Sequence, residues 1–428
     1  MLDKMLIEGG SKLEGEIIIS GSKNAALPIM AASLLTDETV VLSNVPQLAD
    51  VVTMSHLLIN HGVNLSVDGV NLDRAVSGRT ILLNAENVSN YEAPYDIVRK
   101  MRASILVLGP LLTRYRKAIV SLPGGCAIGT RPINMHLEAL KSLGAKIDIS
   151  EGYIIAEAKN GLKGNKINFD SVSVGATENV IMAASLAEGE TLINNAACEP
   201  EVVDLCNLLV SMGAKIKNIG TSRIVVEGVK KLKGAYHEVI SDRIEAGTFA
   251  IAALITKGEI LLRNINHLYI ANIIDKLSQV GAKILVHEDS VRVKFDKFNQ
   301  SVDLSTNIYP GFPTDLQAQF MTLMTVTKGN CRIVENIFEN RFMHVPELMR
   351  MGADIKVSGN TAHINGVESL KGAEVMATDL RASVSLVLAG LVSEGSTMIN
   401  RIYHIDRGYE KIEDKLNQCG AKISRVTN

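Results

Sequence analysis

A glycine-rich run around one cysteine has the clearest capacity for chemistry in this 428-residue sequence. Residues 122–132 read Leu-Pro-Gly-Gly-Cys-Ala-Ile-Gly-Thr-Arg-Pro, and three glycines with two prolines exclude a helix interior or a central strand. The run is therefore predicted to be a loop with Cys126 in its middle and Arg131 nearby. A thiol that is exposed and close to a guanidinium is partly ionised, as a reactive cysteine requires.

A lone free cysteine is more often a small buried hydrophobe than a reactive group. Glycines on both sides of Cys126 provide little packing surface, which favours the chemical role. The other four cysteines are scattered in or beside apolar runs without metal-like pairing, so we expect them to pack in the core and the protein to be cytoplasmic. They are Cys198, Cys206, Cys331 and Cys419.

Polar residues stand at or just ahead of the starts of six apolar stretches. Helix starts carry free N–H groups and partial positive charge, which suit phosphates and carboxylates. For Ser173 and Thr314, taken alone, capping of the helix is the favoured role. Lys23, Arg102 and Arg381 do not cap helices, and a cation is mildly unfavourable there, so we expect an anion beside each. The full set is Lys23, Asn24, Arg102, Ser173, Gly175, Asp242, Arg243, Thr314, Asp315, Asp379 and Arg381.

The chain repeats one pattern six times. A glycine, mostly followed by alanine and a strand-like run, recurs roughly every 70 residues, which suits a small α/β module and predicts a helix end at each glycine. These glycines are Gly62, Gly144, Gly213, Gly281, Gly352 and Gly420. Each module also holds a nearly all-apolar stretch, which predicts a buried helix. The six stretches are 25–35, 97–112, 176–187, 244–256, 316–327 and 380–392.

These elements predict three modules in each of two domains, with strands outside and one helix per module at the centre. The second helix of each module, for example 136–143, carries charge on one face and should lie outside. If the three inner helix starts of a domain point the same way, two facing domains would enclose a cationic cleft.

The composition excludes several classes of protein. Lys plus Arg (44) nearly balances Asp plus Glu (46), so no bulk charge attracts nucleic acid or a membrane surface. Neither a signal peptide nor a membrane-spanning run is expected. Aromatic residues make up only 4% of the chain and tryptophan is absent, so the cores must be aliphatic.

The start Gly21-Ser-Lys-Asn-Ala25, the Pro-Gly-Gly-Cys loop and the sixfold repeat together resemble the enolpyruvyl transferases. The resemblance extends along the whole chain and includes the runs 338–346, 376–383 and 401–408. It implies two inside-out α/β barrel domains of three modules each. We expect residues 23–240 to form the first, and residues 1–22 with 241–428 to form the second.

The match is closest to the family members that act on UDP-N-acetylglucosamine. It implies transfer of the enolpyruvyl group of phosphoenolpyruvate to the sugar 3-hydroxyl with release of phosphate, the first committed step of peptidoglycan and cell wall synthesis. It further implies no metal, no organic cofactor, no nucleic acid, no membrane insertion and no obligate protein partner.

The resemblance assigns roles residue by residue. Cys126 matches the thiol that protonates the methylene carbon or adds covalently to phosphoenolpyruvate, and it implies sensitivity to fosfomycin-type epoxides. Asp315 matches the carboxylate that takes the proton of the 3-hydroxyl. Lys23, Asn24, Arg131 and Arg407 match the groups that hold phosphoenolpyruvate, with Lys23 and Arg407 also stabilising charge on the departing phosphate.

Further matches concern the sugar nucleotide and the surroundings of the reacting groups. Expected contacts with the sugar nucleotide are Asn24, Arg102, Arg131, Pro132, Ile133, Asn134, Met135, Ser171, Val172, Ser173, Val174, Gly175, Asp315 and Ile337. Glu339, Arg341, Asp379 and Arg381 are expected to shape the site and its closure. Asn134 stands where aspartate is usual, and Ala49 and Ser171 stand where a basic residue is common, which removes positive charge from the edge of the site.

Two alternatives remain open at this point. The related 3-phosphoshikimate transferases share the fold and the phosphoenolpyruvate chemistry, but they lack the Pro-Gly-Gly-Cys loop. A non-catalytic sensor of the sugar nucleotide would be expected to lose at least one of Lys23, Cys126, Asp315 and Arg407, and all four are present. His136 and His344 are expected to be structural.

Overall fold

The computed structural model describes residues 3–68, 78–123 and 133–426. Their contacts divide them into two compact units. The middle unit runs from Gly21 to Ile240, and the split unit combines the residues up to Ser20 with those from Ser241 onward. Within the described ranges, no helix has both the length and the apolar character needed to span a bilayer.

Each unit contains three four-stranded sheets among its described residues, all built to one plan. An edge strand pairs in parallel with its neighbour, and the next two pairings are antiparallel. In the middle unit the sheets, in spatial order, are β14 (Tyr236–Glu238), β3 (Thr39–Val45), β5 (Arg79–Asn84), β4 (Asn64–Asp68); β6 (Glu92–Ala93), β7 (Lys117–Ser121), β9 (Tyr153–Glu157), β8 (Lys146–Ser150); and β10 (Lys166–Asn168), β11 (Glu190–Asn194), β13 (Arg223–Glu227), β12 (Lys215–Lys217).

The split unit repeats this plan with two strands from the start of the chain. Strand β1 (Lys4–Glu8) lies between β23 and β24, and β2 (Glu14–Ile18) is the parallel edge strand beside β15. Without these two strands, two sheets of the split unit would be incomplete, which explains why the first residues belong to it. Its sheets are β2, β15 (Glu259–Arg263), β17 (Ser290–Phe295), β16 (Ala282–Val286); β18 (Leu304–Ser305), β19 (Asn330–Val334), β21 (Thr361–Asn365), β20 (Asp354–Ser358); and β22 (Glu374–Met376), β23 (Ser396–Asn400), β1, β24 (Lys422–Val426).

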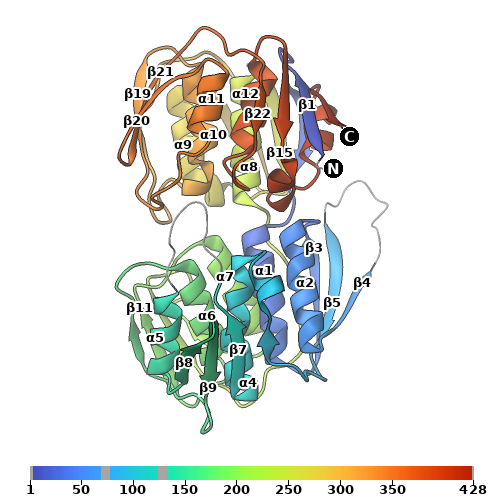
Figure 1. The fold of residues 1–428 in the computed structure, drawn as a ribbon, viewed down its shortest axis with the longest axis vertical. Coiled ribbons are helices and arrows are strands. Elements are labelled where there is room, and N and C mark those ends of the chain that lie inside the picture. Colours follow the sequence, from blue (N-terminus) through green and yellow to red (C-terminus); the bar gives the residue numbers. More distant parts are fainter. Residues whose placement is uncertain (1–2, 69–77, 124–132, 427–428) are drawn as a thin grey trace. The chain divides into compact units, whose positions relative to one another are not determined.

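Buried helices occupy the interior of each unit, with the sheets outside them (Figure 1). The inner helices contact one another, α1 and α4 with α6 in the middle unit and α8, α10 and α12 mutually in the split unit. Most of their residues are buried, as their apolar sequences predict; the partly exposed ones lie mainly at the helix starts and at the end of α4. They are α1 (Lys23–Ala32) with η1 (Ser33–Leu35), η2 (Arg102–Val107) with α4 (Leu108–Tyr115), α6 (Val174–Ala184), α8 (Arg243–Ile255), η4 (Thr314–Leu316) with α10 (Gln317–Thr325), and α12 (Val384–Val392).

Two of the predicted inner helices are shorter than expected. The stretch 97–112 is interrupted, with α3 (Tyr95–Val98), then a 3₁₀ segment, then α4. Pro110, the third residue of α4, has no N–H to bond the carbonyl of Leu106, so the α-helical bonding of α4 does not extend back into the 3₁₀ segment at this residue. The stretch 380–392 becomes α-helical only at Val384; ahead of it, residues 380–383 form a turn that Asp379 caps, its Oδ1 accepting hydrogen bonds from Arg381 N (2.8 Å) and Ala382 N (2.8 Å).

The outer helices end at the repeated glycines. Each of these glycines adopts a positive φ, between 94° for Gly352 and 122° for Gly281, which L-residues with a Cβ rarely adopt. The predicted helix ends are therefore confirmed. The outer helices are α2 (Ala49–His61), α5 (Asn134–Ser142), α7 (Pro200–Ser211), α9 (Ala271–Val280), α11 (Val345–Arg350) and α13 (Ile412–Gln418); the remaining short 3₁₀ helices are η3 (His267–Ile270) and η5 (Ile402–Arg407).

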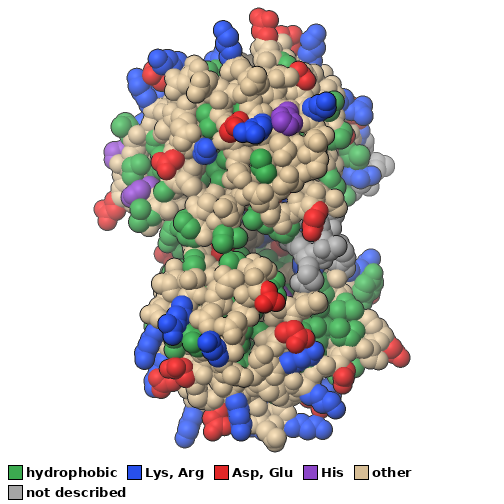
Figure 2. Space-filling model, turned by 90° about the vertical axis from the view of Figure 1, so that its left-hand side faces the viewer, with side chains coloured by type: hydrophobic (Ala, Val, Ile, Leu, Met, Phe, Trp, Pro, Cys, Tyr) green, Lys and Arg blue, Asp and Glu red, His purple; other side chains and the backbone are tan. Residues whose placement is uncertain are grey.

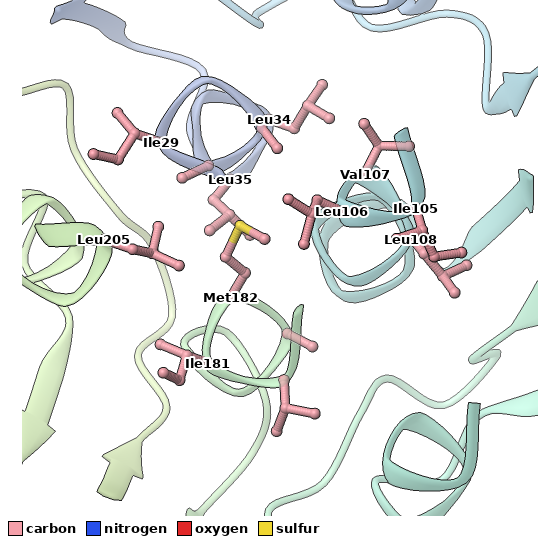
Figure 3. Packing of buried hydrophobic residues seen from close by; sticks show 14 of the residues in the cluster. Ile29, Leu34, Leu35, Ile105, Leu106, Val107, Leu108, Ile181, Met182 and Leu205 are labelled. Atoms are coloured by element: carbon pink, nitrogen blue, oxygen red, sulfur yellow. The ribbon is translucent and has the colours of Figure 1, made fainter. Parts of the chain in front are cut away.

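Each unit has one aliphatic core. In the middle unit, Met182 of α6 points between Leu35 of η1 and Leu106 of η2, with Ile29 and Ile181 close by (Figure 3). All five side chains are buried. Tight packing of this kind fixes the inner helices relative to one another, and so fixes the polar residues at their starts.

Charges of both signs are interspersed on the face of each unit drawn in Figure 2. This matches the formal net charge of −2.

Candidate active site

Lys23, the first residue of α1, is buried and held by a carboxylate. Ser22 caps the helix, since its Oγ accepts a hydrogen bond from the N–H of Ala25. The ammonium Nζ of Lys23 lies 3.3 Å from Oδ2 of Asp50 in the first turn of α2, and both side chains are buried. The anion expected beside Lys23 is therefore present within the protein itself. Asn24 follows, half-buried, at the same helix start.

His136, a buried histidine of α5, lies close to the start of α6 and is linked through Asn179 to η2 and α4. Asn179 of α6 accepts a hydrogen bond from the N–H of Gly109 (2.7 Å), and its amide nitrogen donates to Ile105 O (3.0 Å) and to His136 Nδ1 (3.1 Å). Since an amide nitrogen can only donate, Nδ1 must be unprotonated and His136 neutral. Burial, followed by the nearby charge of Arg102, lowers the pKa of His136 to about 4.

The same imidazole lies beneath the turn at residues 171–175. A Cβ on Gly175 would meet the His136 ring carbon Cε1 at 3.3 Å, so a larger residue there would crowd the ring. Ser173 caps α6, its Oγ accepting a hydrogen bond from Ala176 N (3.3 Å), so the capping prediction for Ser173 is confirmed. Ser171 Oγ donates to the sulfur of Met135 (3.6 Å), which links the turn to the start of α5.

These contacts bring together several of the predicted site residues of the middle unit. Arg102, Met135 and the turn at Ser171, Val172, Ser173, Val174 and Gly175 converge around His136, with Ile133 and Asn134 at the start of α5. Two helix starts, those of α1 and α6, present backbone N–H groups; Lys23 is the first residue of α1, and Arg102 lies near His136, which packs against Gly175 of α6. Such groups bind phosphates and other anions.

In the split unit, Asp315 is a partly exposed carboxylate held by two buried arginines. Its Oδ1 accepts a hydrogen bond from Arg341 Nη2 (2.9 Å), and its Oδ2 lies 3.7 Å from Arg381 Nε. The Asp315 side chain is 24% exposed, against 3% for Arg341 and 1% for Arg381. The two guanidiniums therefore orient the Asp315 carboxylate, and its partial exposure leaves it accessible.

Arg381 is also the centre of a buried network. Its Nη2 donates to Asp242 Oδ2 (2.9 Å), its Nη1 donates to Gly408 O (2.8 Å), and its guanidinium lies 5.3 Å from the ring centroid of Tyr409. Burial by itself raises the pKa of Asp242, but Arg381 and the N–H groups that Asp242 caps bring this pKa below its ordinary value. The anions expected beside Arg381 are thus protein carboxylates.

Charged groups from three further segments lie near this network. Burial lowers the pKa of Arg341, yet the charges of Asp315, Asp379 and Glu335 outweigh it, so the pKa is raised. Burial lowers the pKa of His344 to about 4, with Asp379 opposing and Arg341 adding to that shift. Both histidines predicted to be structural, His136 and His344, are buried.

Arg407 and Asp379 both lie close enough to His404 to affect its pKa. Burial lowers the pKa of His404, and the charge of Arg407 lowers it further while Asp379 acts in the opposite direction. Arg407 ends η5 and is half-buried, whereas Glu339 is exposed. Asp315, Arg341, Arg381, Asp379 and Arg407 thus share one region of the split unit.

Some sequence predictions fall elsewhere. Cys126, Arg131 and Pro132 lie outside the described residues. The capping prediction for Thr314 is wrong, because its hydroxyl donates to Glu335 Oε2 (2.9 Å) and makes no helix cap. Ile337 follows Glu335 at a short distance along the chain, and its N–H donates to Glu335 Oε1 (2.8 Å).

Sequence reasoning missed Asp50, Asn179 and Glu335, the partners that hold Lys23, His136 and Thr314. A weak signal exists for two of them. Asp50 is the one polar residue among the first four of α2, and Glu335 is an acid directly after β19, in which only Cys331 and Ile333 are buried. Such isolated polar residues in apolar surroundings need a partner, but the sequence does not say which.

A family model described as EPSP synthase (3-phosphoshikimate 1-carboxyvinyltransferase) matches residues 7–416. Curated relatives named UDP-N-acetylglucosamine 1-carboxyvinyltransferase match over nearly the full length of both chains. The protein from Xanthobacter autotrophicus is 55% identical over 428 residues, covering 100% of both chains. That from Paramagnetospirillum magneticum is 54% identical with 99% of each covered, and that from Rickettsia massiliae is 56% identical with 99% of this chain and 100% of the other covered.

Solved structures share the fold. The crystal structure of the enolpyruvyl transferase NikO from Streptomyces tendae superposes with a TM-score of 0.89 at 22% identity, covering 100% of this chain and 99% of the other. EPSP synthase from Acinetobacter baumannii has a TM-score of 0.76 at 18% identity, covering 99% and 100%. At these identities the likeness concerns the fold.

Proposed function

Because the chain belongs to the EPSP synthase family of carboxyvinyltransferases, we propose that it transfers the enolpyruvyl group of phosphoenolpyruvate to the 3-hydroxyl of UDP-N-acetylglucosamine and releases phosphate. One observation carries the choice of acceptor. Relatives with this name match the whole chain at 54–56% identity. Structures of EPSP synthase match at only 18%.

The middle unit supplies anion-binding groups to the proposed site. Lys23, fixed by Asp50, would bind the phosphate or carboxylate of phosphoenolpyruvate together with Asn24, Arg131 and Arg407. The capped start of α6 at Ser173 suits a diphosphate, since its N–H groups point out of the helix. Arg102, Ile133, Asn134, Met135 and Ile337 would contact the rest of the sugar nucleotide, with Arg131 and Pro132 at the uracil ring.

The split unit supplies the proposed proton acceptor. In the addition step, the 3-hydroxyl oxygen bonds to C2 of phosphoenolpyruvate, its proton passes to Asp315, and a proton is added at C3. In the elimination step, the bond from C2 to the phosphate oxygen breaks, C3 loses a proton, and the double bond forms again. Arg341 Nη2 lies 2.9 Å from Asp315 Oδ1 and Arg381 Nε lies 3.7 Å from Oδ2, so the two guanidiniums orient the carboxylate toward its proposed role.

Cys126 is proposed to serve the carbon end of the reaction, as proton donor to C3 or through a covalent adduct with phosphoenolpyruvate. The mass of the intact protein after mixing with phosphoenolpyruvate distinguishes the two roles, because only the adduct adds mass. Alkylation of Cys126 by a fosfomycin-type epoxide is a further part of this proposal. It predicts a single added mass that Cys126→Ala abolishes.

The test of the function is phosphate release from phosphoenolpyruvate with and without UDP-N-acetylglucosamine. We expect release to require the sugar nucleotide and to fall about 10²-fold or more in Cys126→Ala and in Asp315→Asn. Cys198→Ala is the matched control, since Cys198 is a half-buried cysteine that the proposal does not use. Wild-type protein that binds the sugar nucleotide but releases no phosphate would contradict the proposal and favour a sensor.

The second candidate is a 3-phosphoshikimate 1-carboxyvinyltransferase. It is favoured by the description of the family model that matches residues 7–416. The same assay separates the two functions, because shikimate 3-phosphate in place of the sugar nucleotide would then trigger phosphate release.

Three finer statements belong to the same proposal. We infer that the units are inside-out α/β barrels, that the reaction serves peptidoglycan and hence cell wall synthesis, shape and division, and that it takes place in the cytoplasm. The enclosed inner helices and outer sheets of each unit support the first inference. The acceptor sugar nucleotide supports the other two.

A further inference from the structure

Glu335 is a buried carboxylate that the reaction as proposed does not use. It directly follows β19 and is 3% exposed. Its Oε1 accepts hydrogen bonds from Thr306 Oγ1 (3.0 Å) and from the N–H groups of Ile337 (2.8 Å) and Phe338 (3.2 Å). Its Oε2 accepts one from Thr314 Oγ1 (2.9 Å). A buried carboxylate is costly unless it is well hydrogen-bonded, and these four donors provide that.

Two of the four donors, Thr314 and Phe338, connect Glu335 with the proposed proton acceptor Asp315 and with its partner Arg341. Thr314 immediately precedes Asp315. On the other side, the Phe338 ring lies 5.5 Å from the guanidinium carbon of Arg341, and Arg341 donates to Asp315. Contacts therefore run in a closed ring from Glu335 through Thr314 to Asp315, then through Arg341 and Phe338 back to Glu335.

We propose that Glu335 is a positioning residue that fixes the Asp315 carboxylate relative to Arg341 and, through the N–H of Ile337, sets the loop expected to contact the sugar nucleotide. This inference rests on the proposed role of Asp315. It predicts two separable effects, because one arm of Glu335 reaches Asp315 and the other reaches Ile337.

A carboxylate suits this task better than a neutral side chain with a single acceptor oxygen. Only a side chain with two oxygens can accept from the 306, 314 and 337–338 segments at once. Its negative charge also acts on Arg341, as the raised pKa of that guanidinium reflects after the larger effects of burial and of Asp315. Glu335 thereby joins the positions of an acid and a cation that are 26 residues apart in sequence.

Thr314→Val tests the arm toward Asp315 in steady-state kinetics. Valine keeps the shape of threonine but loses the hydrogen bond to Glu335, so we expect kcat to fall about 10-fold with the KM values unchanged within about twofold. Thr327→Val is the matched control. Thr327 is fully buried in the same unit, and among the described residues its hydroxyl bonds only the backbone at Leu323 O (2.8 Å). This variant should lose similar thermal stability and keep the wild-type kcat.

Glu335→Ala and Glu335→Gln test the residue itself. Alanine removes both arms, so kcat should fall about 100-fold and the KM for UDP-N-acetylglucosamine should rise. Glutamine keeps an oxygen for Thr306, Ile337 and Phe338 and can donate from its amide to the Thr314 hydroxyl. We therefore expect glutamine to restore kcat to within about threefold of wild type.

The outcomes separate this inference from the function on which it rests. If Asp315→Asn is inactive while Thr314→Val and Glu335→Ala lose no more kcat than Thr327→Val, the function stands and the positioning role is refuted. If Asp315→Asn keeps the wild-type kcat, the proposed base is wrong, and Glu335 has no base to position. A kcat loss in Thr314→Val beyond that of Thr327→Val, with rescue of Glu335 by glutamine, supports the inference.

Discussion

Replacing Arg381 by methionine should lower the free energy of unfolding of the split unit by about 3–5 kcal/mol, the usual effect of removing one partner of a buried ion pair. Methionine keeps most of the apolar volume but loses the hydrogen bonds to Asp242 Oδ2 (2.9 Å) and Gly408 O (2.8 Å). Asp242, whose side chain is 4% exposed, would then keep a negative charge without its cationic partner. For a unit of this size, the loss corresponds to a fall in Tm of roughly 6 to 20 °C.

The loss should depend on pH in a defined direction. In the wild type, the lowered pKa of Asp242 stabilises the folded state at every pH above about 3.9, the ordinary pKa of an aspartate. This stabilisation is lost as the pH falls through the pKa that Asp242 has in the folded protein. Without Arg381, burial dominates and favours the neutral acid. Protonation at lower pH would then remove the unpaired charge. The stability difference between wild type and Arg381→Met should therefore be larger at pH 8 than at pH 5.

Urea unfolding followed by circular dichroism at both pH values measures this difference. The double variant Arg381→Met with Asp242→Asn is the control, since asparagine can still cap α8 through its side-chain oxygen but carries no charge. It should be more stable than the single variant by about 1–3 kcal/mol. A double variant as unstable as the single one, with a loss equal at both pH values, would show that packing around Arg381 is responsible and would refute the argument from charge.

Three other predictions follow from single residues. Folding lowers the pKa of His136 to about 4, so the unfolded state binds more protons between about pH 6.5 and 4. The free energy of unfolding should therefore fall by up to about 3 kcal/mol as the pH is lowered through that window. His136→Gln should flatten this dependence in urea titrations. Gly213→Ala should cost about 1–2 kcal/mol, since Gly213 has φ of 101° with no atom within 4 Å of an added Cβ, and Gly213→Asn should cost less in thermal scans. Asp50→Leu should raise the KM for phosphoenolpyruvate about 10-fold through loss of Lys23 orientation, and an unchanged KM would mean that the pair is only structural.

Much of the fold could be predicted from the sequence, because it depends on interactions within short segments of the chain. The repeated glycines end helices because a positive φ is strained for other residues, and they do so wherever the chain folds. The all-apolar stretches form buried helices because no face of them favours water. The same reasoning failed at 99–107, where a break and a 3₁₀ segment precede α4, and at 379–383, where a turn capped by Asp379 precedes α12.

The partners of the polar residues were decided only by the tertiary structure. The sequence marked Lys23 and Arg381 as cations in need of an anion, and Thr314 as a helix cap. Packing of distant segments instead brought Asp50 to Lys23, placed Asp242 beside Arg381 from 139 residues away, and turned Thr314 toward Glu335. Hydrogen bonds and ion pairs act over a few ångströms, so their choice depends on which segments the core places side by side, and no local pattern contains that information.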